Sequence, residues 1–280
     1  MNSADPEKSL PRAARHPLVM DFPAGNHPDR ENRKFMTSLA RGMEVLAAFQ
    51  HRFGPLGNKQ LAQVTGLPKA TVSRITFTLK ELGYLRINAE TGRFELSPAV
   101  LSLGYPLLSG LRIRHVAHDF MLELARTGGG TVGLAAADGA SMVYVDEACG
   151  DSSRSLRVDV GARVEMCRSG LGRAWLAGIS DMAREAMFSG FKAAYGPEWP
   201  DLQQRIESAR AQIRVRGFCI VDKEWRPDTR TAAVPLVCAD RRTVMALGLG
   251  APAFSVALET LERDIGPRLV HIGHQISRFF

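Results

Sequence analysis

The sequence lacks the patterns that mark several large classes of protein. No apolar run approaches the roughly 18 residues of a membrane-spanning helix. The N-terminus lacks the charged start, apolar core and cleavage site of a signal peptide. The four cysteines are widely spaced and form no Cys-x-x-Cys pair: Cys149, Cys167, Cys219 and Cys238. These absences favour a cytoplasmic protein with reduced, mostly buried thiols, and redox sensing by Cys167 is the less favoured alternative.

Catalytic and phosphate-binding motifs are also missing. The sequence has no Gly-x-Ser-x-Gly elbow, no phosphate-binding loop and no Gly-x-Gly-x-x-Gly after a strand. Two histidine pairs have helical spacing, but neither has a nearby third metal ligand: His115 with His118, and His271 with His274. A hydrolase built around Ser169 remains an alternative, although no base is indicated for it. We therefore predict no metal, no cofactor and no enzymatic activity.

Length, composition and charge indicate what is present instead. The chain has 280 residues, 45% of them hydrophobic and 23% charged, which is enough for two globular domains. The formal net charge is +7. Residues 34–97 contain nine Lys and Arg against four Asp and Glu, whereas residues 98–280 contain 22 against 20. The positive excess is thus concentrated in residues 34–97, as contact with nucleic-acid phosphates requires.

The N-terminal residues divide into a tail and a helix. Residues 1–33 contain five prolines and no hydrophobic period, which predicts a flexible tail. Four arginines there could instead form an arm along DNA, although a plain tail is favoured: Arg12, Arg15, Arg30 and Arg33. An apolar stripe then predicts a helix over residues 38–49 with Ser38 as its N-cap. The stripe consists of Leu39, Met43, Leu46 and Phe49.

Residues 58–96 have the pattern of a helix, a tight turn, a second helix and a two-stranded wing. Asn58 can cap the first helix, Gly66 can end it, and Pro68 fits the first position of the second helix. The predicted buried face of the second helix is Val72, Ile75, Leu79 and Leu82. The predicted exposed face is Ala70, Ser73, Arg74 and Phe77. An apolar back and a small, basic front suit the DNA major groove, and an ordinary amphipathic helix hairpin is the alternative.

The wing is predicted from two alternating segments around a turn. Residues 84–87 and 93–96 alternate like strands, and residues 88–92 form the turn. Arg86 and Arg93 flank the hairpin tip, where a wing contacts phosphates.

These motifs carry a family resemblance. The runs SLARGMEVLAAF and LAQVTGLPKATVSRITFTLKELGYLRINAETGRFELSPAVLSLG resemble the amino-terminal domain of the IclR (isocitrate lyase regulator) family of bacterial transcription factors. The resemblance implies a two-domain α+β protein. Residues 34–97 would form a winged helix-turn-helix, residues 98–127 linker and dimerisation helices, and residues 128–280 a GAF-like α/β effector domain. The DNA contacts that we predict are Lys69, Thr71, Ser73, Arg74, Arg86 and Arg93.

The linker has two helical patterns, over residues 98–108 and 113–126. Pro106 is expected to kink or shorten the first helix. The leucines of the first helix would be buried only against a partner chain, so we expect a homodimer or a tetramer. A symmetric dimer would bind a pseudo-palindromic operator.

The C-terminal part mixes strands and helices. Six strands are predicted over residues 131–137, 141–148, 155–161, 218–225, 231–238 and 243–250. Helices are predicted over residues 169–178, 202–216 and 255–278. This order fits a six-stranded antiparallel sheet covered by helices.

The resemblance extends to VGARVEMCRSGLGRAWLAG, which in the family sets helix-start amides against the carboxylate of a small effector. A helix N-terminus is suited to bind an anion. By this match Gly170 and Leu171 would donate their N–H groups, with Ser169 beside them. Leu156 and Val164 fall where the family has apolar pocket residues. Arg168 could bond a carboxylate or simply be a surface residue.

A second matching segment, GFCIVDKEWRPDTRTAAVP, departs from the family pattern. Val221 stands where many members have an acid, and Asp222 and Glu224 remain of the acidic run. Four further residues fall at pocket positions: Thr229, Thr231, Gly248 and Gly250. Fewer acids and hydroxyls predict a roomier, less polar pocket. That favours a larger acid, such as an aromatic carboxylate, over glyoxylate or pyruvate.

We therefore predict a transcription regulator that binds double-stranded DNA and a small organic acid. A sensor that has lost DNA binding is a further alternative, against which Lys69, Ser73 and Arg74 argue.

Overall fold

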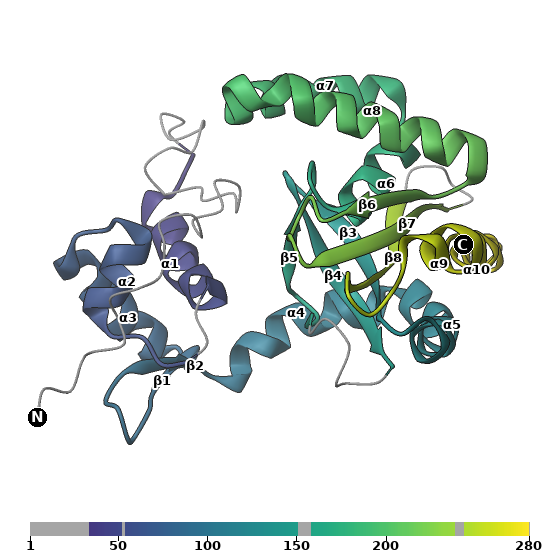
Figure 1. Cartoon of the computed structure of the whole chain (residues 1–280). Coiled ribbons are helices and arrows are strands. Elements are labelled where there is room, and N and C mark those ends of the chain that lie inside the picture. The colour runs from purple at the N-terminus through teal and green to yellow at the C-terminus, as the bar shows by residue number, and fades with distance from the viewer. Residues whose placement is uncertain (1–33, 52–53, 151–157, 239–243, 280) are drawn as a thin grey trace, which may run out of the picture. The chain divides into compact units, whose positions relative to one another are not determined.

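The computed structural model describes residues 34–51, 54–150, 158–238 and 244–279. It divides into two compact units, the first ending at Leu111 and the second beginning at Arg112 (Figure 1). No helix of the described residues is long and apolar enough to cross a membrane. The predicted tail, residues 1–33, lies outside the described residues.

The first unit is a three-helix domain with a wing and a following helix. Its elements are α1 (Thr37–Ala47), η3 (Ala48–His51), α2 (Asn58–Thr65), α3 (Lys69–Glu81), β1 (Leu85–Ile87), β2 (Phe94–Leu96) and α4 (Pro98–Gly110). One core joins the helices to the wing. It consists of Val45, Ala48, Phe49, Leu56, Leu61, Val72, Leu79 and Leu85.

The buried face of α3 differs from the predicted one at its end. Val72 and Leu79 are buried as predicted, but Leu82 is 62% exposed and Thr76 is buried instead. Leu82 occupies the C-cap, where the chain leaves the helix. The Thr76 hydroxyl can be buried because Asn58 Oδ1 and a backbone carbonyl are each within 3.1 Å of it.

Three predicted helix starts are one residue or two out of place. The N-cap of α1 is Met36, not Ser38, and the N-cap of α2 is Gly57, not Asn58. Pro68 is the N-cap of α3 rather than its first residue. In α2 the reason is visible, because the side chain of Gln60 accepts a hydrogen bond from Gly57 N at 2.9 Å.

The predicted stripe of α1 is only partly buried. Phe49 belongs to the core and Leu46 packs against it. Leu39 and Met43 are exposed. The helix that the stripe predicted is present, and within the described residues only the second half of the stripe is covered by the core.

In the wing, β1 and β2 pair antiparallel with Arg86 opposite Glu95. Leu56 adds a short bridge to Phe94, with backbone bonds of 2.8 and 2.9 Å. The wing is thereby joined to the segment before α2.

The helix α4 continues through Pro106 to Gly110, so of the two expected effects of this proline, a kink or a shortening, the shortening does not occur. None of its residues is buried. The carbonyl that Pro106 leaves without a backbone donor can therefore bond to water. Ser97 caps the helix, its Oγ accepting from Ala99 N at 3.2 Å.

The second unit is a six-stranded sheet between two layers of helices. Its strands are β3 (Thr131–Asp138), β4 (Ser141–Cys149), β5 (Arg163–Glu165), β6 (Cys219–Asp222), β7 (Thr229–Val237) and β8 (Val244–Pro252). Its helical elements are α5 (Arg112–Gly128), α6 (Gly170–Gly178), α7 (Asp181–Tyr195), η4 (Gly196–Glu198), α8 (Trp199–Arg216), α9 (Leu258–Thr260), η5 (Leu261–Ile265) and α10 (Gly266–Ser277).

The sheet order is β5-β4-β3-β8-β7-β6, and every neighbouring pair is antiparallel. On one face α6 packs on the sheet and is covered by α8 and α7, while α5 and α10 pack on the other face (Figure 1). A large apolar core lies between the sheet and α6–α8. The six-stranded antiparallel sheet that the sequence predicted is confirmed.

Two predictions for this unit need correction. Residues 155–157 of the predicted third strand lie outside the described residues, and residues 158–161 are not a strand. The strand is instead β5, which begins at Arg163, two residues after the end of the predicted strand. Gly161 has a φ of 90° and belongs to a turn before it. The predicted C-terminal helix is divided into α9, the π-helical η5 and α10.

Candidate functional site

A small cavity lies at the N-terminus of α6, against the sheet. Its volume of about 20 Å³ has room for about one water molecule. Seven of its lining residues were predicted from the sequence: Val164, Ser169, Gly170, Leu171, Thr231, Gly248 and Gly250. Four were not: Thr131, Tyr144, Val158 and Trp225. Sequence positions from β4, β5, α6, β7 and β8 are thus brought together at one place.

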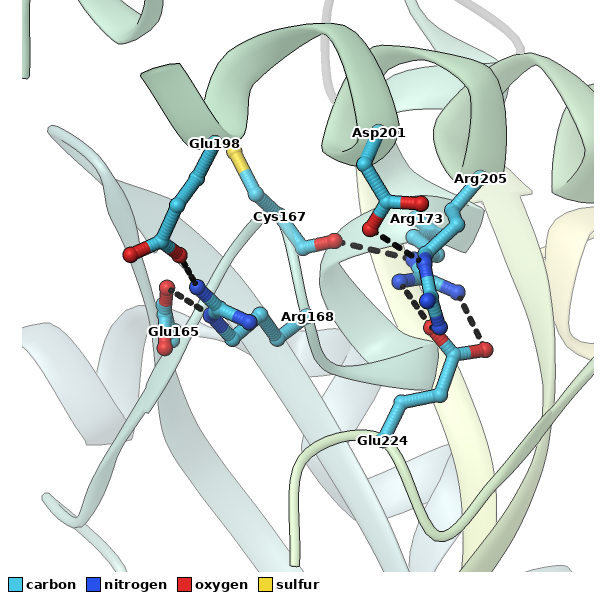
Figure 2. Close-up of polar contacts among 8 residues, drawn as sticks. All are labelled: Glu165, Cys167, Arg168, Arg173, Glu198, Asp201, Arg205 and Glu224. Carbon is cyan, nitrogen blue, oxygen red and sulfur yellow. Dashed lines mark hydrogen bonds and ion pairs between the residues drawn. The ribbon is translucent and has the colours of Figure 1, made fainter. Parts of the chain in front are cut away.

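Other predicted effector residues lie elsewhere. Arg168 pairs with Glu165 at 3.1 Å and with Glu198, and it does not line the cavity (Figure 2). Asp222 pairs with Arg230 at 2.7 Å. Of the remaining predicted effector residues, Val221 and Thr229 are buried but do not line the cavity. Leu156 is not among the described residues.

The first turn of α6 presents two backbone donors to the cavity. Ser169 is the N-cap, and its Oγ accepts from Gly172 N at 3.1 Å. Within the described residues, the N–H groups of Gly170 and Leu171 have no hydrogen-bond acceptor. Because the N-terminus of a helix also carries partial positive charge, this turn can bind a carboxylate.

Glycine is required for the close approach of this turn to its neighbours. A Cβ at Gly172 would lie 2.1 Å from the carbonyl oxygen of Met166, and one at Gly170 would lie 2.8 Å from Thr231 Cγ2. The glycines of the SGLG run therefore let the backbone, rather than a side chain, form this wall of the cavity.

The ring of Tyr144 lies across the neighbouring strand at Gly133. A Cβ at Gly133 would be only 2.2 Å from Tyr144 Cε1. Burial raises the pKa of Tyr144, and the charge of Arg226 opposes that shift only in part. The phenol therefore stays protonated at neutral pH, and among the described residues it has no hydrogen-bond partner. The alternation of β4 could have indicated Tyr144, because Met142 and Tyr144 share a face with the buried core.

Trp225 lies in the loop between β6 and β7, next to a buried ion pair. Arg173 Nη1 and Nη2 donate to the two carboxylate oxygens of Glu224 at 3.0 and 2.7 Å (Figure 2). Arg205 Nη1 also contacts Glu224, at 2.7 Å. Arg173 Nε donates to the carbonyl of Cys167 at 2.8 Å. One carboxylate thus connects the Trp225 loop with both α6 and α8.

The electrostatics of this ion pair favour an ionised carboxylate. Burial would raise the pKa of Glu224, but hydrogen bonds from Arg173 and Arg205 outweigh it and hold that pKa below its ordinary value. The adjacent Lys223 has a φ of 60°, a left-handed conformation that a non-glycine residue rarely adopts. The ion pair is therefore one of the contacts that hold this loop in a strained conformation.

The predicted DNA-contact residues are mostly on the surface of the first unit. Lys69, Ser73, Arg74, Arg86 and Arg93 are exposed, and Thr71 is partly buried. Within the described residues, no ion pair involves Lys69, Arg74 or Arg93. Arg86, by contrast, pairs with Glu95 at 2.6 Å. The charge of Arg86 is thus partly neutralised, which the sequence did not indicate.

Phe77 remains on the outer surface of α3. Its side chain is 63% exposed and belongs to neither the scaffold core nor the wing. The sequence placed Phe77 on the exposed face of this helix, and the structure shows it there.

Within the residues that the structure describes, no group of three or more His, Cys, Asp or Glu side chains could hold a metal ion.

Comparisons with known proteins agree with this architecture. Residues 38–88 match the IclR helix-turn-helix domain, and residues 106–278 match the bacterial transcriptional regulator IclR C-terminal domain. The HTH-type transcriptional regulator TsaQ1/TsaQ2 of Comamonas testosteroni is 31% identical over 86% of this chain and 87% of its own. An IclR family transcriptional regulator from Brucella abortus has 38% identity and a TM-score of 0.75, covering 92% and 97% of the two chains.

A more distant structure shares the fold. It is an IclR homolog of Microbacterium hydrocarbonoxydans complexed with 4-hydroxybenzoate, with 19% identity, a TM-score of 0.68, and coverage of 87% and 100% of the two chains. The matched relatives are transcriptional regulators rather than enzymes. With both domain models matched in order along most of its length, this chain belongs to the IclR family of bacterial transcriptional regulators.

Proposed function

We propose that this regulator is a cytoplasmic homodimer or tetramer whose operator binding is controlled by an aromatic carboxylate. The observation that carries the proposal is the pair of unbonded amides at Gly170 and Leu171 in a cavity that Tyr144 and Trp225 also line. The amides match the carboxylate, and the two rings match an aromatic body. The 4-hydroxybenzoate complex of the Microbacterium homolog supports this class of ligand.

The size of the cavity adds a condition to this proposal. A space for about one water molecule is too small for a benzene ring, so a wall has to move when an aromatic acid enters. Trp225 is the bulky lining residue that stands in a loop, whereas Tyr144 stands in a central part of β4. The cavity in this structure is not the roomier pocket that the sequence predicts, and we propose that this movement opens it.

The DNA contacts follow from the outward face of α3 and from the wing. Lys69, Ser73 and Arg74 are exposed on α3, and we propose that they meet the major groove, with Thr71 at its edge. Arg93 is the stronger candidate for phosphate contact, because Glu95 competes for Arg86. Residues 34–97 would bind DNA and residues 128–280 the effector.

The partner of α4 is proposed to be a second copy of this chain. Its large apolar side chains are exposed: Leu101, Leu103, Tyr105 and Leu107. A helix with no buried residue and several exposed leucines is stable only when another surface covers it. Within residues 98–127, the proposed linker, α4 is therefore the dimerisation element.

Two measurements on the full chain test the proposal. The operator is located by footprinting the DNA upstream of the chain's own gene, and its mobility shift is measured with and without added acids. Calorimetry then compares benzoate with benzamide, which has the same ring but no charge. We expect benzoate and its hydroxylated relatives to bind and to change the shift, and benzamide to do neither. Tight binding of pyruvate or glyoxylate without any binding of aromatic acids would exclude the proposed effector class.

A further inference from the structure

An aromatic side chain stands in the middle of the exposed face of α3, which we propose binds DNA. Phe77 is 63% exposed on α3, and no ring contact or cation–π contact of it is found among the described residues. Covering an exposed phenylalanine side chain with another apolar group would stabilise the complex by removing that surface from water. The question is which surface it meets when the regulator is at work.

The direction of Phe77 follows from helical geometry. At about 100° per residue, Phe77 lies roughly 60° around the helix from Arg74 and roughly 20° from Ala70. All three are exposed, and the buried side chains of α3, Val72 and Thr76 among them, lie on the other side. Phe77 therefore belongs to the same outward face as the arginine that is proposed to meet DNA.

The chemistry of this face suits one occupant in particular. Nine basic residues against four acidic ones in residues 34–97 favour the DNA polyanion over an ordinary protein surface. Within the major groove, the apolar feature that a base pair presents is the 5-methyl group of thymine, and phenylalanine is one of the side chains that contact it. The guanidinium of Arg74 is suited to a guanine edge.

We infer that Phe77 selects a thymine in each operator half-site by packing on its 5-methyl group. Phe77 stands three residues after Arg74, which is about 4.5 Å along the helix axis at 1.5 Å per residue. Successive bases of a strand are separated by about 3.4 Å. The selected thymine therefore lies within one or two base pairs of the base that Arg74 contacts. This inference rests on the proposed role of α3 in DNA binding.

The test replaces thymine by uracil, which removes the methyl group and leaves every hydrogen-bonding atom of the base in place. Each thymine of the footprinted operator is exchanged in turn, and the affinity of the full chain is measured by fluorescence anisotropy at one fixed salt concentration. In each half-site, exchange of one particular thymine should weaken wild-type binding about fourfold. This corresponds to about 0.8 kcal/mol for one buried methyl group. Phe77→Ala should bind the thymine operator more weakly and should be indifferent to that exchange.

Two further variants separate base selection from other effects. Leu82→Ala removes another exposed apolar side chain at the end of α3, off the outward face, and should keep the full sensitivity to uracil. Phe77→Leu keeps an apolar side chain and should restore part of the sensitivity. Circular dichroism checks that each variant is folded, which is expected because Phe77 is not part of the core.

The outcomes are distinct. A wild type that ignores every uracil exchange, or a Phe77→Ala variant that keeps the sensitivity, overturns the inference while leaving DNA binding itself intact. A change in oligomeric state of Phe77→Ala in sedimentation would also overturn it, because this face would then meet a second copy. If no upstream fragment is bound at all, the proposed function fails first.

Discussion

Arg173 and Glu224 form a bidentate ion pair between α6 and the loop that carries Trp225. The arginine side chain is 3% exposed, so its charge has little contact with water and depends on this partner. Replacing Glu224 by Ala is expected to lower the free energy of unfolding by about 3 kcal/mol, since it leaves a buried guanidinium without its counterion. Chemical denaturation at neutral pH measures the loss.

The matched control for that variant is Arg205→Ala. Arg205 contacts the same carboxylate, but its side chain is 46% exposed, so its removal should cost less than about 1 kcal/mol. Fluorine NMR of protein labelled with 5-fluorotryptophan reports on the loop itself. The Trp225 resonance is the one that is lost in Trp225→Phe. Its resonance should shift or broaden in Glu224→Ala and stay in place in Arg205→Ala. Equal losses of stability in both variants would contradict the view that Arg173 is the partner that matters.

The same carboxylate makes stability dependent on pH. The pKa of Glu224 is held below its ordinary value of 4.5 in the folded protein. The stabilising contribution is therefore fully present above about pH 4.5, and it is lost as pH falls through the lower folded-state pKa. Glu224→Gln should show a smaller loss of stability between pH 5 and pH 3 than the wild type. Parallel pH curves for the two proteins would mean that other carboxylates cause the acid sensitivity.

Gly133→Ala tests the packing of the Tyr144 ring against the neighbouring strand. The new methyl group would lie 2.2 Å from Tyr144 Cε1, and the resulting overpacking should cost about 1–3 kcal/mol of stability. Benzoate affinity should fall as well, because the displaced ring lines the cavity. Truncating the ring in Gly133→Ala/Tyr144→Ala should relieve the clash. Gly190→Ala, in the middle of α7 with open space around it, is the control and should be neutral or stabilising.

Arg74→Ala tests the reading of base edges. We expect a loss of about 1–3 kcal/mol in binding to the operator and a much smaller loss on unrelated DNA, if the guanidinium contacts a base. Lys80→Ala, which removes an exposed charge already paired with Glu81, is the control. An equal loss on every DNA sequence would reduce Arg74 to a phosphate contact.

The cysteines give a chemical test of burial. Burial raises the pKa of the Cys167 thiol to about 12, and that of Cys219 to about 12 as well. Since the thiolate is the reactive form, neither should react with a thiol reagent at pH 8 until the protein is unfolded. The partly exposed Cys149 should react first in the native protein. Rapid native modification of Cys167, identified by mass spectrometry, would revive the redox alternative.

The parts of the fold that the sequence predicted well are those in which a local pattern and the tertiary environment agree. Val72 and Leu79 repeat at helical spacing and are buried, and the alternating segments became β3, β4, β7 and β8. Thr76 could not be predicted as a core residue, because its burial depends on Asn58, which is distant in sequence. Leu82 fits the period but lies where the helix ends.

The cavity shows the same division. Ser169, Gly170 and Leu171 were predicted because a helix start has a recognisable local sequence. Trp225 was missed because its place in the lining depends on an ion pair from α6. The alternation of β4 indicates the face on which Tyr144 lies, but the room for its ring depends on a glycine in the adjacent strand. Arg168 was assigned to the cavity by its neighbours in sequence, and Glu165 and Glu198 hold it elsewhere.

If α4 pairs with a second copy of this chain, as proposed, the regulator becomes sensitive to its own dilution. A helix of 13 residues with no buried side chain is marginal by itself, since isolated helices shorter than about 12–15 residues barely form in water. If a second copy supplies the missing contacts, the order of α4 follows mass action, and scarce chains spend much of their time with this segment frayed. Two half-sites on one operator would raise the local concentration of chains and so complete the helix where it is needed. Abundance, and not only the effector, would then set how much competent regulator the cell contains.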